Sequence, residues 1–129
     1  MGYFSQTKGE YQDTEDVVVF PSTTLAAEAA SNGTPIEVGD LTTANLEFEV
    51  SALSAGDEVA AKIQTSKDGT GSGVGAWRDV ASFTTATATG TERKSFAGLD
   101  RFIRAVVTPA DESESGGVSA TVSIKGELK

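Results

Sequence analysis

The chain has 129 residues with 19 acidic and 10 basic side chains, a net charge of −9, and its length fits one domain. The excess of acidic groups argues against a broad phosphate-binding surface, so nucleic acid is not expected as a partner. Histidine and cysteine are both absent. Their absence excludes His-based proton shuttles, Ser-His and Cys-His nucleophile pairs, Cys or His zinc sites and disulfides. We therefore expect neither the familiar catalytic machinery nor a bound cofactor.

The apolar composition favours strands over helices. Val, Ile and Thr together number 32 against 6 Leu, and β-branched side chains pack well on a pleated sheet but lose rotamer freedom in a helix. The longest apolar run is Val17–Phe20, far below the roughly 20 residues that span a bilayer. The first residues lack the basic and apolar regions of a secretory signal peptide, so neither a membrane span nor a signal peptide is expected.

Residues 1–16 are expected to form an extended arm that precedes a single domain at 17–129. They are polar and acidic, with three aromatic side chains, Tyr3, Phe4 and Tyr11, at no regular period. Three aromatics favour an arm that packs on this domain or on a neighbouring subunit. A frayed terminus is the alternative.

The stretch 24–31 is ambiguous between strand and helix. The run LAAEAAS has high helix propensity, and Asn32-Gly33 after it would serve as a C-cap. An extended segment at 22–25 and the apolar alternation of Ile36-Glu37-Val38 instead favour a hairpin across Asn32-Gly33. We favour the interpretation of this stretch as strand over helix.

Six further strands follow from period-2 alternation of apolar and polar residues. The strand beginning at Asn45 is expected to bury Leu46, Phe48, Val50 and Ala52, and a turn at 54–57 is expected to join it in a hairpin to a strand burying Val59, Ala61 and Ile63. The others are expected at 77–83, at 91–97 as a charged edge strand, at 101–109 with both faces partly covered, and at 118–125. The sum of seven or eight mostly antiparallel strands predicts an all-β sandwich.

The glycine-rich segment 68–76 contains G-x-G-x-x-A, a spacing found in dinucleotide-binding loops. No helix is expected after it, so a flexible hairpin loop is the better interpretation. Asp68 is expected to cap the turn by accepting backbone hydrogen bonds. Trp77 is expected to pack in the core or at its rim, with a sugar-stacking platform as the alternative.

Carboxylates offer two weaker candidates for a site. The clusters Asp13-Glu15-Asp16 and Asp111-Glu112-Glu114 could supply oxygen ligands to calcium, but neither has EF-hand spacing. Glu47 and Glu49 could form a catalytic carboxyl pair by residue type, but they lie on the wet face of their strand. Solvated surface charge is the expectation at all of these positions, and no metal site is predicted.

Charge is distributed unevenly along the chain. Residues 1–60 carry 11 acidic groups and one basic group, whereas residues 61–129 carry 8 acidic and 9 basic groups. The candidate interface residues of the second half are Arg78, Arg93, Lys94, Arg101 and Arg104. One copy could present its acidic half to the basic strands of another. Alternatively, the two halves pair within one monomer.

Four segments together resemble a known class of protein. The run IQTSKDG, the Trp of AWRDVASF, the stretch GTERKSFAGLDRFIRAVVT and the terminal VSIKGE are similar to small β-sandwich virion proteins of tailed bacteriophages. The shared progression, QTS-DG-W … F … G … GL-RF-R, covers about half the chain. The stretch between Asp68 and Trp77 is longer than in that progression.

The resemblance implies a jelly-roll domain that decorates or cements the outside of a phage capsid. On this reading the protein is not an enzyme, and its partners are the major capsid protein and copies of itself, as a homotrimer. Its expected location is the virion surface, after synthesis in the host cytoplasm. A component of the tail or head fibre and a carbohydrate-binding module on a similar sandwich are the alternatives.

Overall fold

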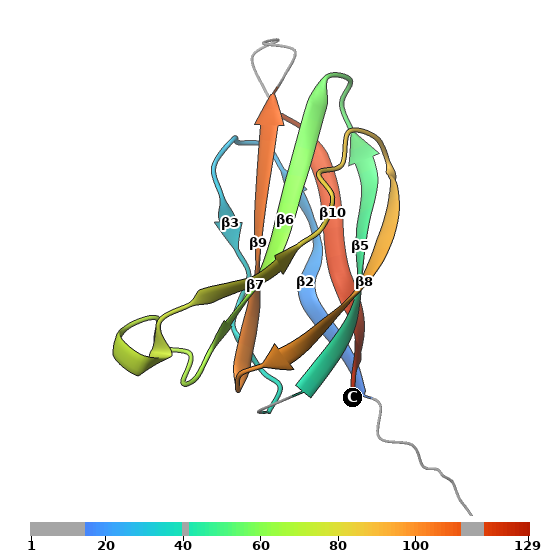
Figure 1. The fold of residues 1–129 in the computed structure, drawn as a ribbon. Coiled ribbons are helices and arrows are strands. Elements are labelled where there is room, and N and C mark those ends of the chain that lie inside the picture. The colour runs from blue at the N-terminus through green and yellow to red at the C-terminus, as the bar shows by residue number, and fades with distance from the viewer. Residues whose placement is uncertain (1–14, 40–41, 112–117) are drawn as a thin grey trace, which may run out of the picture.

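A computed structural model describes residues 15–39, 42–111 and 118–129, and these form an all-β sandwich (Figure 1). The first strand of the described part, β2, includes Glu15 and Asp16, the last two residues of the expected arm; the rest of that arm lies outside the described residues. The strands of the described part are β2 (Glu15–Leu25), β3 (Ser31–Asn32), β4 (Ile36–Glu37), β5 (Thr42–Leu53), β6 (Asp57–Ser66), β7 (Arg78–Ser82), β8 (Gly90–Leu99), β9 (Phe102–Asp111) and β10 (Ala120–Leu128).

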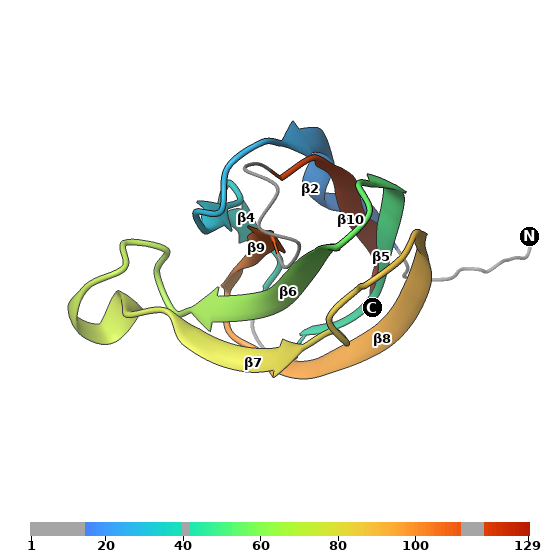
Figure 2. The same ribbon diagram turned by 90° about the horizontal axis from the view of Figure 1, so that it is seen from above.

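The strand order is that of a jelly roll. One sheet has the order β2-β10-β5-β8, and the other has β9 between β6 and the short strands β3 and β4, with β7 at the far edge. If β3 and β4 count as one interrupted strand, the described part has eight strands. Numbered from 1 at β2 to 8 at β10, these strands form one sheet of order 1-8-3-6 and another of order 2-7-4-5, which is the double Greek key of a jelly roll. Figure 2 shows the two sheets as facing layers. The predicted fold class is confirmed.

The core lies between the sheets and follows the predicted alternation. Apolar side chains of β5, β6, β9 and β10 that were expected to point inward are almost fully buried; they include Leu46, Phe48, Val50, Val59, Ala61, Ile63, Ile103, Val107, Val122 and Ile124. Each such burial contributes roughly 1.5–3 kcal/mol for a large apolar side chain. The period-2 pattern therefore predicted correctly which side chains of these strands face the core.

Ala52 is an exception, because it is exposed rather than buried. Thr121 of β10 pairs with Ala52, but the next residue, Val122, pairs with Val50. One extra residue, Ser51, therefore forms a β-bulge, and a bulge shifts the following side chains to the opposite face.

Both hairpins predicted in the first half of the chain are wrong. The turn at 54–57 joins β5 in one sheet to β6 in the other, so these strands are not paired. β3 and β4 do not pair with each other, because both pair with β9. In a jelly roll most connections cross between the sheets, and β6–β7 is a hairpin that stays within one sheet. The stretch 26–30 is neither helix nor strand.

Polar side chains close the side of the sandwich where β7 and β8, the edge strands of the two sheets, lie next to each other (Figure 2). The ammonium of Lys94 on β8 donates to the carbonyl of Ser82 on β7 at 2.6 Å, and Glu92 accepts from the backbone N–H of Thr84 at 2.8 Å. Beneath them Phe83 packs on aromatic rings of the other sheet. The predicted edge position of 91–97 is confirmed, and the edge is covered rather than open.

Candidate functional site

The structure separates the five basic candidates into three places. Arg93 lies on the outer face of the four-stranded sheet, whereas Lys94 points into the seam between β7 and β8. Arg78, Arg101 and Arg104 lie at the end of the five-stranded sheet that carries the β6–β7 loop. The aromatic candidates Tyr3, Phe4 and Tyr11 lie outside the described residues.

Among the described residues, two ion pairs join the acidic half of the chain to the basic half within one molecule. Arg101 contacts Glu37, and Arg93 approaches Glu47 at 3.9 Å. The side chain of Arg93 is 82% exposed, and exposed pairs of this kind contribute about 0–1 kcal/mol. Pairing within the monomer therefore occurs, but it leaves the guanidinium of Arg93 accessible to a partner.

Arg104 forms a contact that the sequence did not predict. Its guanidinium lies over the ring of Trp77, 4.5 Å from the ring centroid, and its Nε donates to Gln64 at 2.9 Å. Gln64 in turn donates to Asp79 at 2.9 Å, and this bond, together with one from Lys62, holds the pKa of Asp79 below its ordinary value. The register pairs Gln64 with both Arg104 and Asp79, so knowledge of the strand order was needed to find this ladder.

The β6–β7 loop, residues 67–77, is an ordered structure and projects from the sandwich (Figures 1 and 2). The hydroxyl of Ser66 donates to the carbonyl of Gly75 at 2.5 Å, and the N–H of Gly71 donates to the same carbonyl at 3.0 Å. The N–H of Gly75 donates to Ser72, and a single 3₁₀ turn at Gly73–Gly75 precedes β7. Because these amide groups are engaged inside the loop and no α-helix follows, the arrangement does not resemble a phosphate cradle.

Asp68 caps this loop as predicted. Its Oδ1 accepts hydrogen bonds from the backbone N–H of Thr70 at 2.9 Å and from the Thr70 hydroxyl at 2.7 Å. These bonds favour the ionised carboxylate and so lower the pKa of Asp68 below its ordinary value of 3.8, the hydroxyl having the larger effect. Gly75 has no room for a side chain, because a Cβ there would overlap the Asp68 carboxylate. The expected hairpin loop is thus confirmed but is internally braced.

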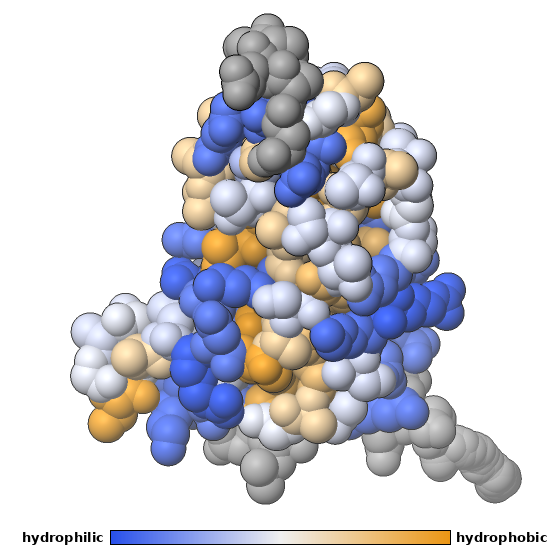
Figure 3. Space-filling model, turned by 45° about the horizontal axis from the view of Figure 1, so that its top comes forward, coloured by the Kyte–Doolittle hydropathy of each residue, from blue (hydrophilic) through white to orange (hydrophobic). Residues whose placement is uncertain are grey.

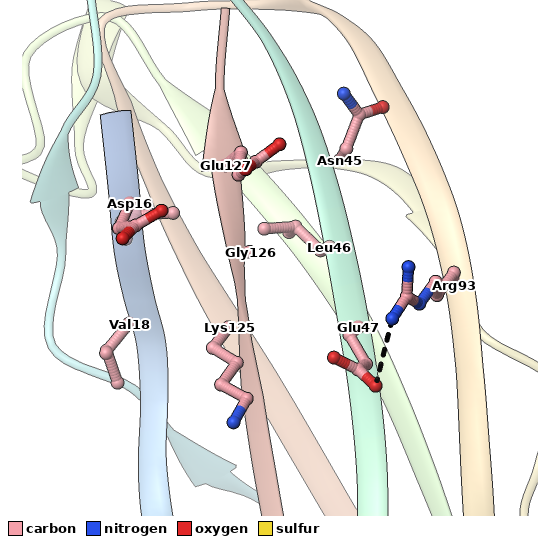
Figure 4. A pocket seen from close by; sticks show the side chains of 10 residues that line it. Asp16, Val18, Asn45, Leu46, Glu47, Arg93, Lys125, Gly126 and Glu127 are labelled. Carbon is pink, nitrogen blue, oxygen red and sulfur yellow. Dashed lines mark ion pairs between the residues drawn. The ribbon is translucent and has the colours of Figure 1, made fainter. Parts of the chain in front are cut away.

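A hollow of about 510 Å³ lies on the outer face of the four-stranded sheet, near the start of β2 (Figure 4). Its lining comes from all four strands and includes Asp16, Val18, Asn45, Glu47, Arg93, Lys125 and Glu127. Gly126 also lines the hollow; a Cβ there would overlap the carbonyl oxygen of Asn45, so glycine allows β10 and β5 to approach closely. One signal in the sequence could have indicated this site: Val18 is an apolar residue that points outward from the run Val17–Phe20.

The acidic candidates do not form a visible metal centre. Glu15 and Asp16 lie on β2, whereas Asp13, Glu112 and Glu114 lie outside the described residues. Glu47 and Glu49 occupy the outer face of β5, where Glu47 neighbours Arg93. Within residues 15–39, 42–111 and 118–129 there is no group of three or more acidic side chains that could hold a metal ion. None of these segments forms a helix long and apolar enough to cross a membrane.

Comparison of the chain with protein-family models, with curated proteins and with solved structures finds no match.

Proposed function

We propose that this chain is a non-enzymatic structural virion protein that decorates or cements the outer surface of a tailed-phage capsid through protein–protein contacts. The observation that carries the proposal concerns the contacts among the residues on which the resemblance to such proteins rests. They lie far apart in the sequence but contact one another in the fold.

These contacts link the end of β6 and the β6–β7 loop to the start of β9. Gln64 binds Arg104, the hydroxyl of Thr65 donates to the carbonyl of Phe102 at 2.8 Å, and it accepts from the N–H of Asp100 at the same distance. Gly69 packs so closely on the ring of Phe102 that a Cβ would lie 3.2 Å from it. A pattern whose separated members form one cluster describes a structural unit, and this supports the resemblance.

The fold is compatible with an assembly role but does not select it. Jelly rolls occur in viral capsid domains and also in lectins, and one fold hosts many functions. A cementing protein needs a rigid shape and complementary surfaces, and the closed seam and braced loop supply rigidity. Weak contacts repeated over a particle would add by avidity.

The N-terminal segment is the proposed contact with neighbouring subunits. Residues 1–14 precede Glu15, the first residue of β2, which is an edge strand of the four-stranded sheet. The segment carries Tyr3, Phe4 and Tyr11, and aromatic side chains are favoured anchors in protein interfaces. The proposed partners are the major capsid protein and further copies of this chain, as a homotrimer.

A binding experiment with capsids tests the proposal. The purified chain is mixed with capsids assembled from the major capsid protein of the phage that encodes it, and the mixture is sedimented through a gradient. We expect the full chain to move with the capsids and a variant lacking residues 1–14, which keeps the whole of β2, to bind more weakly. If the full chain stays at the top of the gradient, the proposal fails. Gold-labelled particles in the electron microscope separate capsid binding from binding to a tail or fibre.

A carbohydrate-binding module is the second candidate, and Trp77 is the residue on which it depends. The guanidinium of Arg104 already covers one face of the indole ring, so at most the other face could stack on a sugar. A glycan array and sugar titrations of Trp77 fluorescence test this candidate. Binding on the array would favour it over the capsid proposal.

A further inference from the structure

We propose that the β6–β7 loop of one copy docks into the hollow on the outer face of the four-stranded sheet of a second copy, with Val74 inserted beside Val18. The inference rests on the proposed function, because it names one contact through which copies of this chain associate.

Two large apolar side chains are exposed in the described part of the chain. Val74 is 78% exposed at the tip of the loop, and Val18 is 55% exposed at the hollow. In Figure 3 the loop projects at the lower left and carries apolar surface at its free end. Val74 therefore lies on a protruding surface and Val18 lines a concave one. Two such apolar surfaces, when they are complementary in shape, can form a contact between copies of the chain.

The loop is already held in the shape that docking needs. Gly69, Gly71 and Gly73 have φ angles of 76°, 81° and 59°, which side-chain-bearing residues rarely adopt, and the hydrogen bonds to Ser66 and Asp68 brace the loop from inside. Because little backbone freedom remains to be lost, docking of the tip carries a small ordering cost.

The hollow offers both room and a suitable wall. Its volume of about 510 Å³ falls within the roughly 300–1,000 Å³ of sites that enclose small ligands, so it can take the tip of a loop with two glycines beside its valine. Figure 4 shows Val18 and Lys125 on adjacent strands, with the pair Glu47–Arg93 across from them. The aliphatic stems of Lys125 and Arg93 can pack on an inserted Val74 while their charged ends remain in water.

Charge favours the same arrangement. Among the described residues, Lys67 in the loop and Arg104 at its base have no carboxylate partner. The hollow carries three acidic residues, Asp16, Glu47 and Glu127, against the two basic residues Arg93 and Lys125. The loop also contains the carboxylate of Asp68, so the loop and its base carry a net charge of +1 and the hollow carries −1. These opposite signs favour association of the two surfaces.

The loop extends from the five-stranded sheet (Figure 2). The hollow lies on the outer face of the other sheet, so a molecule cannot fill its own hollow. The contact is therefore heterologous, joining different patches on the two copies. Contacts of this kind close into a ring or extend as an open chain, and a three-membered ring would satisfy the expected homotrimer.

Analytical ultracentrifugation of the full chain, over micromolar to millimolar concentrations, tests the contact. Val74→Glu places an acidic group on the loop tip, and Val18→Glu places one in the hollow; Ala27→Ser, at an exposed position outside both patches, is the matched control. We expect the wild type and the control to associate beyond dimers. Each glutamate variant should raise the dissociation constant at least about tenfold, as loss of one buried valine contact predicts. Unchanged circular dichroism verifies that the variants fold.

Mixing the two variants gives the decisive result. Val74→Glu retains an intact hollow and Val18→Glu an intact loop, so an equimolar mixture should form one-to-one dimers and nothing larger. A monomeric wild type, variants that associate normally, or a mixture that behaves as its separate components would each overturn the inference. Capsid binding by a chain that does not self-associate would leave the proposed function standing, whereas self-association without capsid binding would overturn that function alone.

Discussion

Replacement of Phe83 by alanine should remove the aromatic contact that holds the two sheets together beside the β7–β8 seam. Phe83 directly follows β7, is 4% exposed, and its N–H donates to the carbonyl of Ala61 at 2.9 Å. Its ring centroid lies 5.2 Å from that of Phe48 and 5.3 Å from that of Phe96, both on the opposite sheet. The substitution therefore removes a contact between sheets rather than within one.

The expected loss follows from burial and ring contacts. A buried Phe→Ala change destabilises by about 3–5 kcal/mol, including aromatic pairs worth roughly 0.5–1.5 kcal/mol each. For 129 residues, an unfolding entropy of about 2.1 cal/mol/K per residue converts a loss of ~4 kcal/mol into a fall in Tm of about 15 °C. A domain of this size has a total stability of only about 6–19 kcal/mol. The variant should therefore fold, but with a much smaller margin.

Urea unfolding followed by circular dichroism measures this loss. Phe83→Leu, which keeps most of the buried volume, should cost less than about 1.5 kcal/mol. Phe102→Ala is the matched control, because Phe102 is half-buried on the outer face of β9 and should cost no more than about half as much as Phe83→Ala. A loss below about 1 kcal/mol for Phe83→Ala would refute the role assigned to this side chain.

Three further predictions concern single sites. Gly126→Ala should destabilise the fold by about 1–3 kcal/mol in thermal unfolding, because its Cβ would overlap the backbone of β5. The carboxyl of Asp68 should titrate below 3.8 in NMR; because the folded pKa is the lower one, its bonds stabilise the loop above that pH and are lost as the pH falls through the folded pKa. Thr70→Val should raise that pKa by removing the hydroxyl donor, and an unchanged titration would contradict the assigned cause. Arg104→Ala should expose the ring of Trp77, the single tryptophan of the chain, which acrylamide quenching of its fluorescence would detect as stronger quenching.

Much of the candidate site could not have been found from the sequence. The charge distribution in the sequence indicates five basic residues as interface candidates. In the fold, however, Lys94 donates to the carbonyl of Ser82 in the β7–β8 seam, and Arg101 contacts Glu37. Arg104 meets Trp77 because β9 and β7 both flank β6, a neighbourhood that alternation along a single strand cannot reveal. Gly126, which lines the hollow, permits the close approach of β10 and β5, but nothing in the sequence distinguishes it from the other glycines.

Local chemistry by itself determined that this chain forms strands and which face of most strands is buried. Leu46, Phe48 and Val50 alternate with polar residues, and a pleated strand turns successive side chains to opposite faces, so burial follows from the pattern alone. The capping of the glycine loop by Asp68 is local in the same sense.

Only the tertiary structure decided which strands are neighbours. Alternation is identical whether a strand pairs with the next one in the chain or the chain crosses to the opposite sheet. The pattern around 54–57 therefore predicts a hairpin, although this turn joins the two sheets. The bulge at Ser51 is likewise defined by the pairing of β5 with β10. The same distinction applies to charge. The acidic and basic halves are visible in the sequence, but the ion pairs follow from packing. Glu37 and Arg101 pair within the molecule, whereas the guanidinium of Arg93 remains exposed.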